Sequence, residues 1–141
     1  MYAHVESLEN QVIDMDPSDV LTELSRRFAE LWQRTTGQPE MTACAQLNGD
    51  LLMFSLPSAL TDQQSKQALT DEGYMVVIRE VSLSLDRVYS PLADAIERRL
   101  HCYIGAMQVE LEPERSAIHI QFHLRDAPGL WRLTQLNTHC L

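Results

Sequence analysis

The sequence predicts an α+β domain in which two helix-hairpin (αββ) units form a four-stranded antiparallel sheet with helices on one face. Three observations support this prediction. Apolar residues recur at helical spacing in two segments, two stretches alternate between apolar and polar residues, and turn-forming residues divide each of these stretches into two. The 141 residues are 45% apolar, which is enough for one domain with a core of its own.

The first predicted helix starts just after Pro17. Ser18 is a suitable N-cap, and Gly37 can adopt the left-handed conformation that often follows the last turn of a helix. Between these ends, apolar residues recur every three or four positions, at Leu21, Leu24, Phe28, Leu31 and Trp32. This spacing predicts an amphipathic helix with one buried face.

The first hairpin is predicted over 41–47 and 50–56. Asn48-Gly49 lies between these stretches, and this dipeptide supplies the positive φ angles that a two-residue hairpin turn needs. The resulting register places Ala43 opposite Phe54 and Ala45 opposite Leu52. Small side chains would therefore face large ones on the core side of the sheet.

The region between the hairpins is expected to be helical. Thr61 opens a short helix that is predicted to end near Gly73. Residues 74–88 fit either a strand, because four consecutive residues are apolar or β-branched, or a helix, because a longer stripe has helical spacing. We favour the helix, and we expect it to break or kink at Ser90-Pro91, because proline removes a main-chain hydrogen bond.

The second hairpin is predicted on either side of a four-residue loop at 113–116. This loop length places Glu112 opposite Ala117, Leu111 opposite Ile118, and Glu110 opposite His119. The apolar residues of both strands then share one face of the sheet. Glu110, His119 and His123 share the other face with two glutamines.

The chain divides into three predicted parts. Residues 1–16 are acidic and weakly patterned, which is typical of a flexible N-terminal arm. Residues 17–125 form the single pseudo-duplicated domain. Residues 126–141 form an apolar C-terminal tail that contains Trp131, and such a tail usually packs on its own domain or on a partner.

The two histidines of the second hairpin are the sharpest candidate site. His119 and His123 lie on one face of the predicted strand, about 13 Å apart at ~3.3 Å per residue, which is too far to share a metal ion. An exposed cross-strand pair between Glu110 and His119 is the simpler interpretation. We therefore predict no metal ion and no cofactor.

Arginines are the second candidate group. The helical arginines could, if they converge, hold a small anion such as bicarbonate, phosphate or a carboxylate, although ordinary helix ion pairs explain most of their placement. They are Arg26, Arg27, Arg34, Arg79, Arg87, Arg98 and Arg99. Motifs for a nucleophile, a phosphate loop or a dinucleotide site do not occur in the sequence. We therefore predict no catalytic residues. Partner contacts are expected at Glu110, His119, His123, Arg34, Arg79 and Trp131.

The composition excludes several classes of function. A net charge of −9 disfavours nucleic acid as a partner, because its phosphates would be repelled. The sequence contains neither a run of ~20 apolar residues nor a signal peptide pattern, so we expect a cytoplasmic protein without membrane insertion. The three cysteines form no CxxC pair and no even set, which argues against a disulfide framework. Cys44 is expected to be a core residue and Cys140 a free thiol in the tail.

Residues 21–124 resemble the MpsC-like family, small proteins associated with sodium-translocating systems that generate membrane potential. The matching positions follow the family's order of a helix ending in a threonine-glycine turn, a strand pair, an arginine-bearing helix and a final strand with a phenylalanine motif. They are Thr36-Gly37, Leu60-Thr61, Arg79, Ile96-Glu97 and Phe122-His123-Leu124. The resemblance implies an auxiliary cytoplasmic protein linked to ion or inorganic-carbon transport.

The leading functional hypothesis is a non-catalytic accessory or regulatory protein that acts by protein contact, at a membrane complex, and that forms a homodimer. The alternative is a sensor of a small anion or metabolite that uses arginines and the polar sheet face around His119. A third hypothesis is an enzyme or metalloprotein that uses His119, His123 and Glu110.

Overall fold

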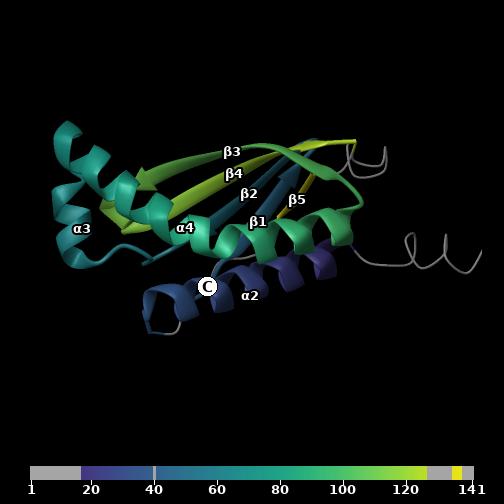
Figure 1. Ribbon diagram of the computed structural model, residues 1–141, viewed down its shortest axis with the longest axis horizontal. Coiled ribbons are helices and arrows are strands. Elements are labelled where there is room, and N and C mark those ends of the chain that lie inside the picture. Colours follow the sequence, from purple (N-terminus) through teal and green to yellow (C-terminus); the bar gives the residue numbers. More distant parts are fainter. Residues whose placement is uncertain (1–16, 40, 127–134, 138–141) are drawn as a thin grey trace, which may run out of the picture.

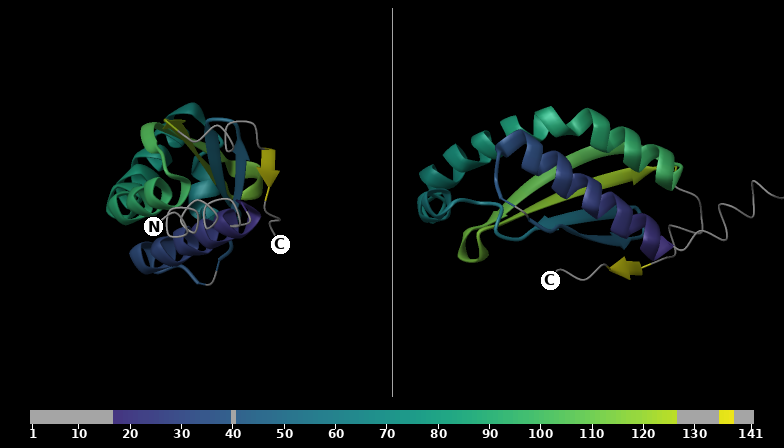
Figure 2. Two further views of the ribbon diagram at one scale, coloured as in Figure 1. Left: turned by 90° about the vertical axis from the view of Figure 1, so that its right-hand side faces the viewer. Right: turned by 90° about the horizontal axis from the view of Figure 1, so that it is seen from below.

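The computed structural model describes residues 17–39, 41–126 and 135–137. These residues form an α+β fold in which two long helices lie on one side of an antiparallel sheet, as Figure 1 and Figure 2 show. The predicted fold class is therefore confirmed. In chain order the elements are α2 (Pro17–Thr36), β1 (Cys44–Asn48), β2 (Leu51–Leu56), α3 (Asp62–Gln67), α4 (Asp71–Leu100), β3 (Tyr103–Glu112), the 3-10 helix η1 (Pro113–Arg115), β4 (Ala117–Arg125) and β5 (Gln135–Asn137).

The strands are ordered β3-β4-β2-β1-β5, and every neighbouring pair is antiparallel. The four predicted strands join where β2 pairs with β4, which connects the two hairpins into one sheet. A fifth strand was not predicted. It comes from the C-terminal tail and pairs with β1, with Leu136 opposite Leu47. The rest of the tail, including Trp131 and Cys140, and the arm at 1–16 lie outside the described residues.

Helix α2 follows the predicted apolar stripe. The helix begins with Pro17, which suits the first position because its missing N–H has no partner there in any helix. Ser18 therefore lies in the first turn and is not the N-cap. The end is as predicted, because Gly37 has a φ of 70° and its N–H donates to the carbonyl of Gln33 at 2.8 Å. Phe28 and Trp32 are among the buried residues of this helix.

The first hairpin has a different turn from the predicted one. The two turn residues are Gly49 and Asp50, so Ala45 lies opposite Phe54 and Leu47 opposite Leu52. Gly49, with a φ of 61°, supplies the positive angle at the first turn position. The predicted register was wrong by two residues. An even shift leaves each side chain on its predicted face, so the core side of the hairpin is unchanged.

The segment that was predicted as one short helix ending near Gly73 contains the whole of one helix and the start of a second. Helix α3 ends at Gln67, and α4 begins at Asp71 with Thr70 as its N-cap. Gly73, expected to end the short helix, lies instead in the first turn of α4. A Cβ atom there would lie 1.7 Å from the carbonyl oxygen of Gln67, so only glycine allows this close approach of the two helices.

Helix α4 is one continuous helix of 30 residues (Figure 1). The helical prediction for 74–88 is confirmed, but the predicted break at Ser90-Pro91 does not occur. Val88 and Leu92, on either side of the proline, are both about 1% exposed within the core. Burial of this face on α2 and the sheet outweighs the one main-chain hydrogen bond that proline removes.

The second hairpin has the predicted register. Glu112 lies opposite Ala117, Leu111 opposite Ile118 and Glu110 opposite His119, around a loop that contains η1. The pairing shifts by one residue between Ile104 and Ala106, which makes Gly105 the extra residue of a β-bulge. Ile104 thereby remains on the core face.

Strand β3 lies at the edge of the sheet, and side chains of α4 occupy part of its open edge. The N–H of Leu111 donates to the hydroxyl oxygen of Tyr74 at 2.9 Å. The N–H of Ile104 donates to a carboxylate oxygen of Glu97, also at 2.9 Å. Helix α4 therefore holds the strand near both of its ends.

The core lies between the helices and the inner face of the sheet. A chain of edge-to-face aromatic contacts crosses it, with ring centroids 5.1 Å apart for Phe28 and Phe54 and 5.9 Å apart for Phe54 and Phe122. This chain joins α2, β2 and β4. The opposite face of the sheet carries no described helix (Figure 2).

Candidate functional site

The side of the sheet that α2 and α4 leave uncovered is called the outer face here. Burial along β2 and β4 alternates, so that every second side chain points away from the core. The outer face is defined by Gln46, Leu51, Met53, Ser55, Gln108, Glu110, Glu112, His119, Gln121 and His123. Several of these side chains are half-buried, because neighbours on adjacent strands cover them.

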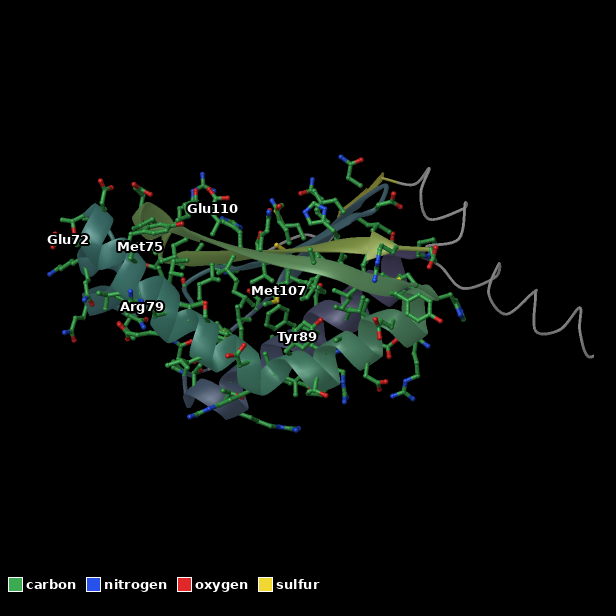
Figure 3. The ribbon with its side chains drawn as sticks, turned by 45° about the horizontal axis from the view of Figure 1, so that its top comes forward. Glu72, Met75, Arg79, Tyr89, Met107 and Glu110 are labelled. Atoms are coloured by element: carbon green, nitrogen blue, oxygen red, sulfur yellow. The ribbon has the colours of Figure 1, made fainter. Side chains whose placement is uncertain are left out.

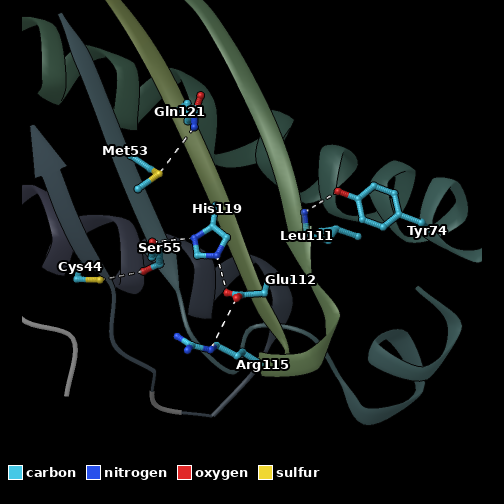
Figure 4. A network of polar contacts seen from close by, with 9 residues as sticks. All are labelled: Cys44, Met53, Ser55, Tyr74, Leu111, Glu112, Arg115, His119 and Gln121. Atoms are coloured by element: carbon cyan, nitrogen blue, oxygen red, sulfur yellow. Dashed lines mark hydrogen bonds and ion pairs between the residues drawn. The ribbon is translucent and has the colours of Figure 1, made fainter. Parts of the chain in front are cut away.

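A polar network on this face has His119 at its centre (Figure 4). The Nδ1 atom of His119 lies 2.8 Å from the hydroxyl oxygen of Ser55, and its Nε2 atom lies 2.9 Å from a carboxylate oxygen of Glu112. The guanidinium of Arg115 approaches the other carboxylate oxygen of Glu112 at 3.7 Å. The network thus links β2, β4 and β3 to the loop that follows β3.

The expected partner of His119 was Glu110, and the observed partner is Glu112. The register places Glu110 directly opposite His119, as predicted, but the carboxylate that contacts the ring comes from the diagonal position two residues along β3. Diagonal neighbours are within reach of a long side chain, and the twist of the strands brings one diagonal closer than the other.

The hydrogen-bond partners assign the roles of the imidazole atoms. An ionised carboxylate only accepts hydrogen bonds, so Nε2 of His119 carries a proton and donates it to Glu112. In the neutral ring, Nδ1 then accepts from the Ser55 hydroxyl. The hydrogen bond from His119 is the largest cause that lowers the pKa of Glu112, and the charge of Arg115 lowers it further, whereas partial desolvation opposes both.

The order serine, histidine, carboxylate is also found in nucleophilic hydrolases. Such enzymes need free N–H donors near the serine oxygen to stabilise the developing oxyanion. Ser55 lies in the middle of the sheet, opposite Cys44 on one side and His119 on the other, so the main-chain groups around it belong to the strand ladders. In the described part of the chain, the arrangement is therefore suited to fixing three strands and presenting a defined polar surface.

The other predicted contact residues lie apart from this network. His123 is exposed, at a position opposite Leu51 and Ala106. Arg34 lies in the last turn of α2, and Arg79 lies on α4, so the sheet separates both from His119. Figure 3 shows Arg79 and Glu110 on separate layers of the molecule. Among the described residues, no three His, Cys, Asp or Glu side chains are grouped as a metal ion requires.

The cysteines differ from the prediction. Cys44 lies opposite Ser55, is half-buried and belongs to a disulfide. The expectations of a core position and of no disulfide were therefore wrong for this cysteine. Its Sγ lies 3.9 Å from the carbonyl oxygen of Ser55, and because a disulfide sulfur carries no hydrogen, this approach is a packing contact. Cys102 is free and buried, and burial, with the nearby charge of Glu97, raises the pKa of its thiol to about 11.

Comparisons of the chain with protein-family models, with curated proteins and with solved structures find no match. Within the described residues, neither long helix has an apolar stretch sufficient to cross a bilayer.

Proposed function

We propose that this chain is a non-catalytic accessory or regulatory protein that binds a protein partner through the outer face of its sheet. The observation that carries the proposal is the one-sided architecture. Both long helices pack on the inner face, and the outer face presents side chains that are half-buried yet accessible.

The composition of the outer face suits a protein contact. The apolar side chains of Leu51 and Met53 lie on the central strand β2, and Gln121 donates from Nε2 toward the sulfur of Met53 at 3.9 Å. Polar groups surround these two apolar side chains, as in many transient interfaces. Because the Ser55, His119 and Glu112 side chains are already held by hydrogen bonds, they would lose little conformational entropy when a partner contacts them.

The cellular setting is proposed from the resemblance to the MpsC-like family. We propose a cytoplasmic protein that acts at a membrane complex for ion or inorganic-carbon transport and that forms a homodimer. Disulfides are uncommon in the cytoplasm, so the disulfide state of Cys44 in the structure counts against this part. Thiol labelling of cells before lysis tests it: a reduced Cys44 in cells would support the cytoplasmic placement, and an oxidised Cys44 would reject it.

Site-specific photo-crosslinking tests the outer face directly. A photoreactive amino acid at Gln108, exposed on the outer face, should give a discrete adduct in cells, with a second copy or with another protein. The same group at Leu83, which is 65% exposed on α4, serves as the control and should not give that adduct. Gln121 lies opposite Gln108. The substitution Gln121→Arg in the chain that carries the photoreactive group at 108 should reduce the yield of the adduct severalfold. Equal adducts at both positions, or none at Gln108, would reject the proposal.

Light scattering tests the homodimer separately. The purified full chain should show the mass of two copies, and the outer-face variant Gln121→Arg should shift it toward one copy if the copies meet through that face. A monomer for the parent chain would reject the homodimer while leaving a different protein partner for the crosslinking experiment to detect.

A further inference from the structure

A cavity of about 540 Å³ lies between α2 and α4, in the layer of helices and away from the outer face. Its volume falls within the range of small-molecule sites, which is about 300 to 1,000 Å³. Side chains of both helices line it, and the charged ones are Glu23, Arg27, Asp94, Arg98 and Arg99. Three arginines of the set named from the sequence, Arg27, Arg98 and Arg99, therefore meet here, on the helices and away from the polar sheet face around His119.

The cavity has a positive charge balance within an acidic chain. Three arginines and two acidic residues line it, whereas the whole chain has a net charge of −9. Arg98 pairs with Asp94 one turn earlier on α4, and Arg99 pairs with Glu23 of α2 at 2.6 Å. The guanidinium of Arg27 forms no hydrogen bond or ion pair with any described residue, and the side chain is exposed, so its N–H donors are available to a ligand.

Arg99 adds a second sign of an unfilled site. Its side chain is 36% exposed, but its Nε atom is buried and, among the described residues, has no hydrogen-bond partner. A buried donor without an acceptor destabilises a protein, and a shift of the Arg99 side chain that opens Nε to an acceptor atom in the cavity would remove this penalty. The ion pair with Glu23 is partly exposed and hence weak, so it can rearrange when an anion enters.

We propose that this cavity binds a small oxyanion, the phosphate or carboxylate group of a metabolite, held by Arg27 and Arg99. A guanidinium presents several N–H donors in one plane and pairs with two oxygens of such a group at once. The free charge of Arg27 and the unsatisfied Nε of Arg99 supply donors from both helices. Ligand binding would then tie α2 to α4. The site lies across the sheet from the outer face, so it is independent of the proposed partner surface.

Isothermal titration of the full chain with inorganic phosphate, and separately with succinate, tests the site and distinguishes the two ligand classes. Ionic strength is held constant with sodium chloride. We expect saturable binding of at least one probe. Arg27→Gln should weaken it about tenfold or more, as expected for the loss of a charge-assisted hydrogen bond.

The matched control is Arg26→Gln. Arg26 is exposed on the same helix but does not line the cavity, so its loss changes the net charge equally and should weaken binding less than twofold. Arg99→Lys keeps the charge but removes Nε, and it should also weaken binding severalfold while circular dichroism shows an unchanged fold. Equal weakening by Arg26→Gln and Arg27→Gln, or no saturable binding of either probe, would overturn the proposal.

Discussion

The two sides of strand β4 show two ways of stabilising one sheet. The inner residues Ile118, Ile120 and Phe122 are 0% exposed and pack among many apolar neighbours. The outer residues differ from one another, since His119 is held between two hydrogen-bond partners, whereas His123 on the same face is exposed. The stability of the inner face depends on how well apolar side chains fill the core. The stability of the outer face depends on specific pairs of neighbouring polar side chains.

The largest effect should follow a truncation on the inner face. Phe122→Ala removes a ring that packs edge-on against Phe54, and it should lower the free energy of unfolding by about 3 to 5 kcal/mol. Urea denaturation followed by circular dichroism measures this change. On the same strand, His123→Ala should stay within about 0.5 kcal/mol of the parent chain. Similar losses for both variants would contradict the contrast between the two faces.

A smaller loss of stability is expected when a hydrogen bond in the polar network around His119 is removed. Ser55→Ala removes the hydrogen bond to Nδ1 of His119 and should cost about 1 kcal/mol in the free energy of unfolding. The imidazole nitrogen chemical shifts of His119 should change as well, which a general loss of stability would not produce. Gln108→Ala, an exposed outer-face variant, is the control and should leave those shifts in place. Unchanged shifts in Ser55→Ala would show that the hydrogen bond is absent in solution.

The smallest expected effect is the change in stability of Glu112→Gln, relative to the parent chain, as the pH is lowered. The pKa of Glu112 is lowered from its ordinary value of 4.5 in the folded chain, so its contribution to stability is present above that value and is lost as the pH falls through the folded pKa. Glu112→Gln removes this contribution. The difference in unfolding free energy between parent and variant should therefore narrow below about pH 4.5. Glu110→Gln controls for the loss of one carboxylate, and identical behaviour of both variants would exclude a special role for Glu112.

The two hairpins show what local sequence can determine. In the second, a four-residue loop fixed every cross-strand pair that was predicted. In the first hairpin, Asn48, Gly49 and Asp50 all favour turns. The turn forms at Gly49-Asp50 and not at Asn48-Gly49, so the cross-strand register differs from the predicted one by two residues. Proline at position 91 favours a helix break, but the helix continues because the buried residues Val88 and Leu92 before and after it pack in the core. Local signals therefore hold where tertiary contacts do not oppose them.

The site was only partly predictable for a related reason. His119 was identified from alternation along its own strand, but Ser55 was missed because it lies opposite His119 only when the two hairpins pair through β2 and β4. That pairing joins residues far apart in the sequence. Glu112 was missed because twist decides which diagonal neighbour contacts the ring. The arginine cavity depends on how α2 and α4 cross, which spacing along either helix does not determine.

The contacts of α4 with β3 limit how this protein can aggregate. An open edge strand of ten residues would normally be a template on which further strands add, and fibrils grow in this way. Here the Tyr74 hydroxyl and the Glu97 carboxylate occupy amide hydrogens near the two ends of that edge. A strand arriving from another molecule would first have to displace both, so concentrated solutions should resist amyloid growth from this side.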